Sequence, residues 1–249
     1  DDDYDGPWKE MLECFFEPFL RFFFPHIHAD IDWSRPPEFQ NTELQRIAQG
    51  ADFGKRQTDK LVKVWLRSGE EAYVLIHIEV QSQYEVGFDA RVSIYNHRLY
   101  LHTGHDVVSL VILGDDRPHW RPQAFERGRW GCVSSFRFLS AKLLDYRDAW
   151  ATLAHDPNPF AAFVLAHLKT QETRHQPTER LTWKLELARI LHEEHFQDQP
   201  QVGRDLLWFI DWIMQVPSEL NPQFWGEVQK MQGEEETMPY VSWIEEQGI

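Results

Sequence analysis

The stretch Leu61–Gln83 limits the possible folds of this chain more than any other part of the sequence. Two β-rich runs flank a turn at Ser68–Glu71, and side-chain character alternates along the second run. A period of two places successive side chains on opposite faces of a sheet. One face would carry Val74, Ile76, Ile78 and Val80, and the other Tyr73, Leu75, His77, Glu79 and Gln81. We therefore expect a β-hairpin with one face in a core and a carboxylate and an amide at the end of the other.

Such a hairpin would bring the start of its first strand beside the end of its second, so Asp59 and Glu79 would lie near each other. Two carboxylates held together repel each other unless a positive charge lies between them, and a hard divalent cation commonly supplies it. The alternative is that both acids are solvated strand ends. The spacing of the residues does not decide between these interpretations.

Composition limits the class of protein. With 249 residues and 42% hydrophobic content, the chain can bury a sizeable core in one large domain or two small ones. Cys14 and Cys132 match no metal-binding spacing, so we expect buried, reduced thiols and a cytoplasmic protein. No apolar run approaches the roughly 20 residues that a membrane span needs, which predicts no membrane partner. The sequence starts without methionine, as a segment of a longer chain would.

The distribution of charge is uneven. The net charge of −15 argues against a protein that coats nucleic acid without selectivity. Residues 1–54 hold 4 basic and 12 acidic side chains, residues 55–147 hold 14 and 11, and residues 148–249 hold 7 and 17. The part that contains the predicted hairpin is therefore the one stretch that is not acidic, and a polyanion could approach there.

The residues before the hairpin predict helices separated by an irregular segment. Apolar residues at helical spacing run from Trp8 to Phe19, and Pro18 should kink or break that helix. Pro25–Pro37 is expected to be a short strand or a loop. The capping-box pattern Thr42–Gln45 predicts a short helix that ends near Gly50 or Gly54.

Beyond the hairpin the pattern predicts a helix at 85–103 with Gly104 as its stop. The apolar run Val107–Leu113 is typical of a strand covered on both faces. Trp130–Phe138 could form one more, edge strand. This order predicts an α/β fold with a mixed sheet flanked by helices.

From Tyr146 onward the pattern is helical throughout. We expect a domain at 1–147 and a helical C-terminal region at 148–249. Thr178 is a plausible N-cap for one of the helices. The expected helices are 146–155, 159–172, 178–196, 203–215 and 221–231.

The hairpin and the helix after it carry a family resemblance. Asp59 opens a strand, the next strand ends in Glu79–Ser82, and the following helix contains Arg91 and Tyr95. This arrangement resembles the recombination-promoting nuclease (Rpn) and transposase-like family of the PD-(D/E)XK nuclease superfamily, from about Trp8 to Tyr146. The helical remainder is similar to the C-terminal half of many uncharacterised bacterial cytosolic proteins.

The resemblance implies a nuclease-like fold and a site for Mg²⁺ or Mn²⁺. Asp59 and Glu79 would each give a carboxylate oxygen, and the backbone carbonyl of Val80 would complete the oxygen ligands. Gln81 stands where the superfamily usually has lysine. An amide can orient a water molecule but brings no positive charge, which leaves the catalytic rate in doubt.

Three further residues are candidates around this site. Arg91 and Lys63 could contact backbone phosphates. Alternatively, Arg91 is a surface helix residue or pairs with Asp89 or Glu85. Glu43 could be an extra carboxylate, although a surface position is the better interpretation.

Two functions follow from the sequence. The first is a Mg²⁺-dependent DNA endonuclease with little sequence specificity, since no basic recognition helix or zinc module is visible. The second is a nuclease-like fold with weak or no catalysis that acts as an interaction, regulatory or homodimer-forming module. The acidity of the chain and Gln81 in place of lysine motivate the second.

Overall fold

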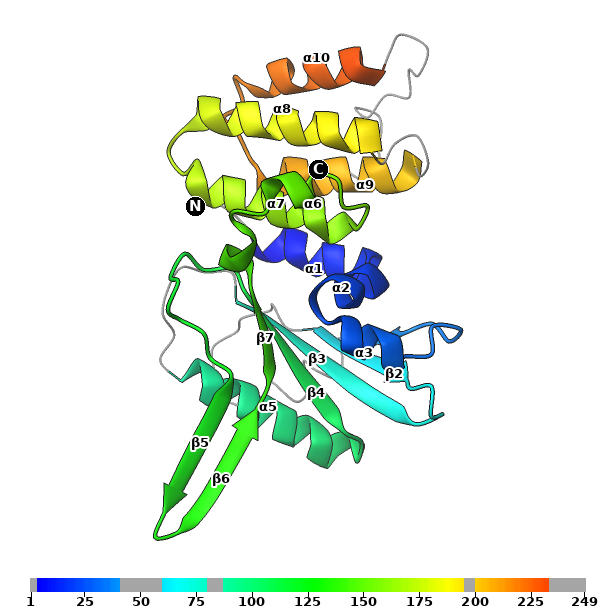
Figure 1. Cartoon of the computed structure of the whole chain (residues 1–249), viewed down its shortest axis with the longest axis vertical. Helices are drawn as coiled ribbons and strands as arrows, with labels where there is room; N and C mark the ends of the chain where they lie inside the picture. Colours follow the sequence, from blue (N-terminus) through cyan, green and yellow to red (C-terminus); the bar gives the residue numbers. More distant parts are fainter. Residues whose placement is uncertain (1–3, 41–59, 80–86, 195–199, 233–249) are drawn as a thin grey trace.

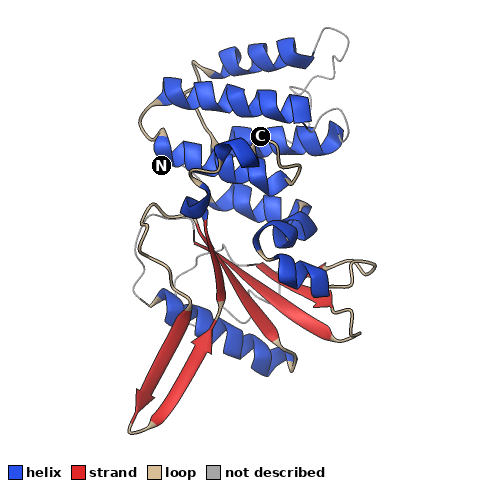
Figure 2. Cartoon of the chain, viewed as in Figure 1, coloured by secondary structure: helices blue, strands red, loops and turns tan. Residues whose placement is uncertain are grey.

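The computed structural model describes residues 4–40, 60–79, 87–194 and 200–232, with the backbone but not the side chains of residues 75–79, 194 and 232. A five-stranded mixed sheet occupies one half of the molecule, and a long helix crosses one of its faces (Figure 1). Stacked helices form the other half, and a two-stranded ribbon projects from the sheet (Figure 2). The expected α/β class with a helical C-terminal region is confirmed.

The chain begins with three short helices, α1 (Asp5–Cys14), α2 (Phe16–Phe23) and α3 (Pro25–Asp30). The predicted break at Pro18 is wrong, because the chain bends three residues earlier, at Phe15. Pro18 lies in the first turn of α2, where a missing N–H leaves no intrahelical hydrogen bond unmade. The irregular segment expected from Pro25 is also wrong at its start, since Pro25 occupies the first position of α3.

The predicted hairpin is confirmed by the strands β2 (Lys60–Trp65) and β3 (Glu71–Glu79). They are antiparallel, and their pairing runs from Trp65 opposite Glu71 to Lys60 opposite Ile76. In the connecting turn Gly69 has a φ of +91°, a backbone conformation that glycine adopts without steric cost. The hairpin therefore brings the last part of β3 back beside the start of β2, as the sequence pattern predicted.

The rest of the sheet is built around β3. Helix α5 (Phe88–Thr103) follows the hairpin and stops at Gly104, and β4 (Val107–Leu113) then pairs parallel to β3. The short strand β1 (Glu38–Phe39) pairs with β2, and β7 (Leu139–Lys142) pairs parallel to β4. The strand order is β1-β2-β3-β4-β7. The helix predicted at 85–103 and the strand at 107–113 are thus confirmed, apart from the start of the helix.

The edge strand predicted at Trp130–Phe138 is not part of this sheet. Residues 132–137 form β6 (Cys132–Arg137), which pairs only with β5 (Ala124–Arg129) in a separate antiparallel ribbon. Most of the ribbon is exposed, and β7 occupies the sheet edge instead. Alternating polar and apolar residues form a strand in either setting, so the pattern could not distinguish them.

The helical region after the sheet agrees with the sequence pattern. Helix α8 begins at Pro177, so Thr178 lies inside its first turn and the predicted N-cap is wrong. The elements are the 3₁₀ helix η1 (Leu143–Tyr146), α6 (Trp150–Leu153), α7 (Pro159–Glu172), α8 (Pro177–Glu194), α9 (Pro200–Ile213) and α10 (Asn221–Gln232).

One continuous cluster of buried side chains joins the sheet to the helices on both sides of residue 147. Trp8 is fully buried against Phe160 and Phe163 of α7, with ring centres 5.9 and 5.0 Å apart. Where side chains of β2, β3 and β4 are described in these clusters, the even-numbered ones face this cluster and the odd-numbered ones face α5. On the first side lie Val62, Val64, Val74, Leu110 and Ile112, and on the second Leu61, Tyr73, Val107, Val111 and Leu113.

Two further properties follow from the side chains. Cys14 and Cys132 are both free thiols, and both are exposed, which corrects the prediction that they are buried. Each lies at the end of an element, where the apolar pattern no longer dictates burial. None of the described helices combines the length and the apolar character that crossing a bilayer would require.

Candidate functional site

Three parallel strands, β3, β4 and β7, end at the same edge of the sheet. Glu79, the last residue of β3, is paired with Leu113, and Leu113 is paired with Lys142, the last residue of β7. Neighbouring strands lie about 4.8 Å apart, so the backbones of Glu79 and Lys142 are about 10 Å apart. Ligands of α/β proteins commonly bind at the carboxyl ends of the strands. We therefore take this edge as the candidate site.

The predicted metal ligands are described only in part. The backbone of Glu79 is described at the end of β3, but its side chain is not. Asp59, Val80, Gln81 and Glu43 lie outside the described residues. The predicted contact between the two carboxylates therefore stays a prediction.

The start of β2 is held by an ion pair. The ammonium of Lys60 donates to the carboxylate of Glu13 on α1, and the Lys60 side chain is 11% exposed. Leu61, the next residue, packs with Tyr95 and Leu99 of α5. Lys60 and Leu61 thus fix the two sides of β2 against helices on opposite faces of the sheet. Tyr95 is itself buried in this contact.

The two predicted phosphate contacts lie at different ends of the sheet. Lys63 pairs across the sheet with Tyr73, six residues before Glu79, which is about 20 Å along a strand. Its ammonium is 3.0 Å from the carboxylate of Glu71, and this partner raises the pKa of Lys63. Lys63 is thus outside the candidate site, and its role in phosphate binding stays a prediction.

Arg91 lies in the first turn of α5, close to the candidate edge. The residue is 8% exposed, so it is not the surface helix residue of the alternative interpretation. Its guanidinium carbon is 5.2 Å from the centre of the Phe88 ring. Phe88 packs in turn with Leu113 in the cluster on the α5 face of the sheet.

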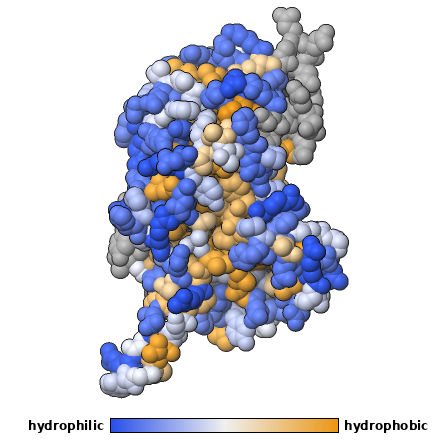
Figure 3. Space-filling view, viewed as in Figure 1, coloured by the Kyte–Doolittle hydropathy of each residue, from blue (hydrophilic) through white to orange (hydrophobic). Residues whose placement is uncertain are grey.

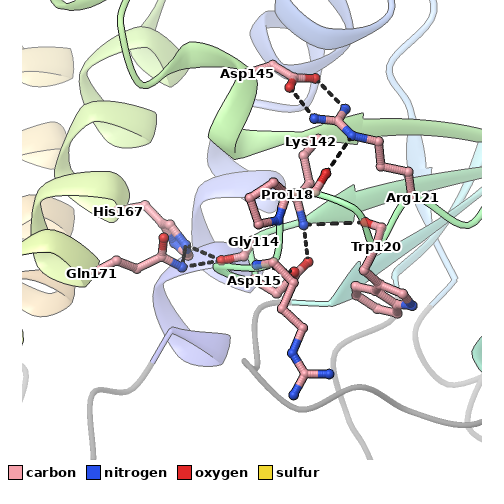
Figure 4. A network of polar contacts seen from close by, with 10 residues as sticks. Gly114, Asp115, Pro118, Trp120, Arg121, Lys142, Asp145, His167 and Gln171 are labelled. Atoms are coloured by element: carbon pink, nitrogen blue, oxygen red, sulfur yellow. Dashed lines mark hydrogen bonds and ion pairs between the residues drawn. The ribbon is translucent and has the colours of Figure 1, made fainter.

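The best-defined polar contact at this edge is a buried ion pair. Lys142 Nζ is 2.5 Å from Asp115 Oδ2, and each side chain is only 2% exposed. Asp115 Oδ1 accepts a second hydrogen bond from the Arg117 amide, 2.9 Å away. Burial lowers the pKa of Lys142, and the Asp115 carboxylate opposes that shift. The pair anchors the loop after β4 to the end of β7 (Figure 4).

An aromatic side chain covers this ion pair. The ammonium of Lys142 lies 5.8 Å from the centre of the Trp120 ring and 3.4 Å from the Trp120 carbonyl oxygen. Trp120 packs edge-on against Phe88, with ring centres 5.4 Å apart. Helix α5 and the loop after β4 therefore meet next to Lys142. Phe88 and Trp120 connect Arg91 to the Asp115–Lys142 ion pair through ring contacts.

A second ion pair lies beside the first at the surface. Arg121 donates to both carboxylate oxygens of Asp145, at 2.8 and 2.5 Å. The guanidinium holds the pKa of the Asp145 carboxyl below its ordinary value. A mostly polar hollow of about 290 Å³ opens here, lined by Phe23, Leu113, Arg121, Gln123, Ser140, Ala141, Lys142, Asp145 and Tyr146.

The loop after β4 is also fixed from the helical side. The Gly114 carbonyl accepts hydrogen bonds from His167 Nε2, at 3.0 Å, and from the amide of Gln171 (Figure 4). The indole N–H of Trp8 donates to His167 Nδ1 at 3.2 Å. Because Nδ1 accepts, Nε2 carries the proton and donates. This chain of contacts holds the candidate edge rigidly against α1 and α7.

The sequence pattern did not indicate Asp115, Lys142 or His167 as parts of the site. Asp115 lies two residues after the end of a strand predicted to be buried, which is the usual place for a functional side chain in an α/β sheet. The position of Asp115 could therefore have been recognised from the sequence. Lys142 and His167 have no such sequence signal, since 27 residues separate Lys142 from its partner and 159 separate His167 from Trp8.

No group of three metal-ligating side chains occurs among the residues whose side chains are described. Comparison of this chain with family models, with curated proteins and with solved structures finds no match. The functional conclusion therefore depends on the geometry of the candidate edge and on the residues of the chain itself.

Proposed function

We propose that this chain is a divalent-cation-dependent endonuclease of the PD-(D/E)XK type that hydrolyses phosphodiester bonds of DNA. The observation that carries the proposal is the pairing of strands at the candidate edge. An antiparallel hairpin is followed by a helix and a parallel strand, and Glu79 ends the central strand of that unit. This is the connectivity that the resemblance to the Rpn family implies around its acidic residues.

The alternation of side chains supports a shared face for the two acids. Leu61 and Tyr73 both pack toward α5, whereas Lys60 reaches α1 on the other face. Continuing the same alternation along each strand, we expect Asp59 and Glu79 on the α5 side. Leu113 and Lys142 face that side as well.

The chemistry of the proposed ligands fits a hard cation. Two carboxylates and a backbone carbonyl are the oxygen donors that Mg²⁺ and Mn²⁺ prefer. When bound, such an ion polarises the scissile phosphate and lowers the pKa of a bound water molecule. Asp59 and Glu79 would hold the ion, the Val80 carbonyl would complete its protein ligands, and the Gln81 amide would orient the attacking water.

Arg91 and the Asp115–Lys142 pair would support the reaction in different ways. Arg91 enters the edge from the first turn of α5 and is the proposed contact for a phosphate oxygen. Lys142 is already matched by the Asp115 carboxylate at 2.5 Å, so the pair adds little net charge. We assign the Asp115–Lys142 pair a positioning role, which is to hold the loop after β4 against the candidate edge, where Glu79 ends β3.

A plasmid-cleavage assay tests this function. Supercoiled plasmid is incubated with the full chain and Mg²⁺ or Mn²⁺, and nicked product is measured with and without a chelator. We expect metal-dependent nicking that is lost in Asp59→Ala and in Glu79→Ala. Glu71→Gln is the matched control, since it removes a carboxylate from the opposite end of β3 and should cleave normally. Full activity in both alanine variants would refute the site.

The second candidate function is a nuclease-like fold that serves as an interaction or homodimer-forming module. The observation that favours it is the ion pair of Lys142 with Asp115, because Lys142, the one lysine described at the candidate edge, is then not available to replace the positive charge that Gln81 lacks. This function predicts a defined oligomer with no cleavage of any nucleic acid. The plasmid assay, run beside sedimentation of the same sample, separates the two.

A further inference from the structure

The ribbon formed by β5 and β6 stands clear of the rest of the molecule (Figure 3). Its pairing is regular over six residue pairs, from Ala124 opposite Arg137 to Arg129 opposite Cys132. At about 3.3 Å per residue, the ribbon is about 20 Å long. Because both faces of its outer part are exposed, the fold alone does not account for its length.

The tip of the ribbon has an unusual conformation. The two-residue turn is Trp130–Gly131, with φ of +53° and +84°. Positive φ at both positions is the pattern of a type I′ turn, where Asn-Gly or Gly-Gly is usual and a bulky residue is rare. Trp130 is nevertheless there, 96% exposed, with the Arg129 guanidinium 5.8 Å from its ring centre. A strained, exposed aromatic residue is more typical of a binding site than of a structural turn.

The charge of the ribbon differs from that of the chain. Residues 124–137 contain three arginines and one glutamate, whereas the whole chain has a net charge of −15. Arg127 and Arg129 are two residues apart on one strand, so they lie on the same face. Among the residues that the structure describes, neither forms an ion pair with a carboxylate. The ribbon therefore presents uncompensated positive charge beside its aromatic tip.

The base of the ribbon is rigidly attached. Phe138 is buried against Phe88 of α5, with ring centres 6.5 Å apart, and Phe136 lies 5.6 Å from the His97 ring. Four residues of β7 continue directly from this base to Lys142 at the candidate edge. The arm thus has a fixed direction relative to the proposed nuclease site.

We propose that the β5–β6 ribbon is an arm that binds double-stranded DNA, with Arg127 and Arg129 on phosphates and Trp130 inserted at a base step. Two-stranded β-ribbons of DNA-binding proteins lie in the major or the minor groove of B-DNA. Arginines beside an aromatic wedge are the side chains that neutralise phosphates and unstack bases. The choice of DNA as the polyanion rests on the proposed function.

The position of the arm suits a long duplex. Eleven residues lead from Gly131 to Lys142, so the tip lies up to about 35 Å from the candidate edge. This distance is close to the length of one helical turn of B-DNA. The arm would therefore hold the duplex about ten base pairs from the scissile phosphate. Its contribution is to affinity, with no part in bond cleavage.

Binding is tested without cleavage, so the arm and the nuclease site can fail separately. A fluorescently labelled 24-base-pair duplex is titrated with the full chain in a chelator, and anisotropy is followed between about 50 and 200 mM salt. In Arg127→Gln/Arg129→Gln we expect binding weakened about tenfold, with a salt slope lower by about 2. The control Arg204→Gln/Lys230→Gln removes two exposed positive charges from α9 and α10 and should bind like the wild type.

The role of Trp130 is tested by Trp130→Asn. Asn-Gly is the preferred sequence for this turn, so the ribbon should fold at least as well and the melting temperature should not fall. DNA binding should nevertheless weaken about tenfold, because stacking by Trp130 is lost. A variant that keeps its fold and loses affinity excludes unfolding as the cause.

Three results would overturn the proposal. The first is unchanged affinity and salt slope in the ribbon variants. The second is an equal loss in the α9 and α10 control, which would show that only total charge matters. The third is a ribbon-dependent change in oligomeric state, or ribbon-dependent binding to anionic phospholipid vesicles, without any effect on DNA. Loss of DNA binding in the ribbon variants, with no nuclease activity in the wild type, would support the arm and refute only the proposed cleavage.

Discussion

Glu79 and Lys142 lie in one row across three parallel strands, because each of them is paired with Leu113. The row is the carboxyl edge of the sheet, and the buried Asp115–Lys142 pair fixes one end of it. The other end contains the acid that the sequence singled out. The structure thus places the predicted acidic position beside a well-defined polar network that the sequence did not reveal.

Lys142→Met should destabilise the protein strongly. It leaves the Asp115 carboxylate buried without its ammonium partner, and breaking such a pair commonly costs about 3 kcal/mol of unfolding free energy. In Asp115→Asn/Lys142→Met both charges are gone, so the loss should be clearly smaller than the sum of the two single changes. Urea unfolding followed by tryptophan fluorescence measures all three variants.

The control for the buried pair is Lys230→Met, since Lys230 pairs with Glu227 on the exposed surface of α10. Exposed pairs contribute about 0.5 kcal/mol or less. Equal losses in Lys142→Met and Lys230→Met would show that the Asp115–Lys142 pair does not anchor the loop after β4.

The Arg121–Asp145 pair should make a small contribution to stability that depends on pH. The Arg121 guanidinium holds the folded-state pKa of Asp145 below the ordinary value of an aspartate, so the unfolded state takes up the proton first as the pH falls. The contribution is complete above about pH 5 and is lost as the pH falls through the folded-state pKa. Because both side chains are about half exposed, we expect about 0.5 kcal/mol at pH 7.

The pH dependence is measured as the difference in unfolding free energy between the wild type and Arg121→Gln. This difference should shrink between pH 5 and pH 3, whereas Arg127→Gln, at an exposed arginine with no ion pair among the described residues, should show no such trend. A difference that stays constant over that range would mean that the carboxylate of Asp145 is not stabilised by Arg121.

Trp8→Phe tests whether the candidate edge depends on the helical half of the molecule. The change removes the donor to His167 Nδ1 and leaves a small cavity beside α7. An unsatisfied buried acceptor together with lost packing should cost about 2 kcal/mol of unfolding free energy. The matched change Trp130→Phe, at an exposed tryptophan, should leave stability nearly unchanged. A loss below about 0.5 kcal/mol in Trp8→Phe would contradict the proposed coupling.

Local patterns in the sequence were enough for much of the fold. The alternation from Val74 and the apolar run Val107–Leu113 predicted the strands correctly, because both strands are held by burial that the residue types report. Pro18 and Pro25 misled, since proline is compatible with the first turn of a helix as well as with a break. The strand β6 was mistaken for an edge strand of the main sheet, because the sequence pattern of one strand does not show which strand it pairs with.

The candidate site was predictable only at one end. Glu79 was singled out because it ends an alternating strand whose predicted hairpin partner begins beside Asp59. Lys142 and Asp115 come together through parallel pairing of β4 with β7, which depends on the whole fold. Ion pairs between distant residues have no local sequence signature, so they had to be found in the structure.

Calorimetric titration with Mn²⁺ measures whether Asp59 and Glu79 bind a common ion. Wild-type protein and Glu71→Gln should each bind Mn²⁺ with the same affinity, and Asp59→Asn and Glu79→Gln should each lose most of that binding heat. Binding that survives unchanged in both Asp59→Asn and Glu79→Gln, or no binding in the folded wild type, would refute a metal site shared by these two carboxylates.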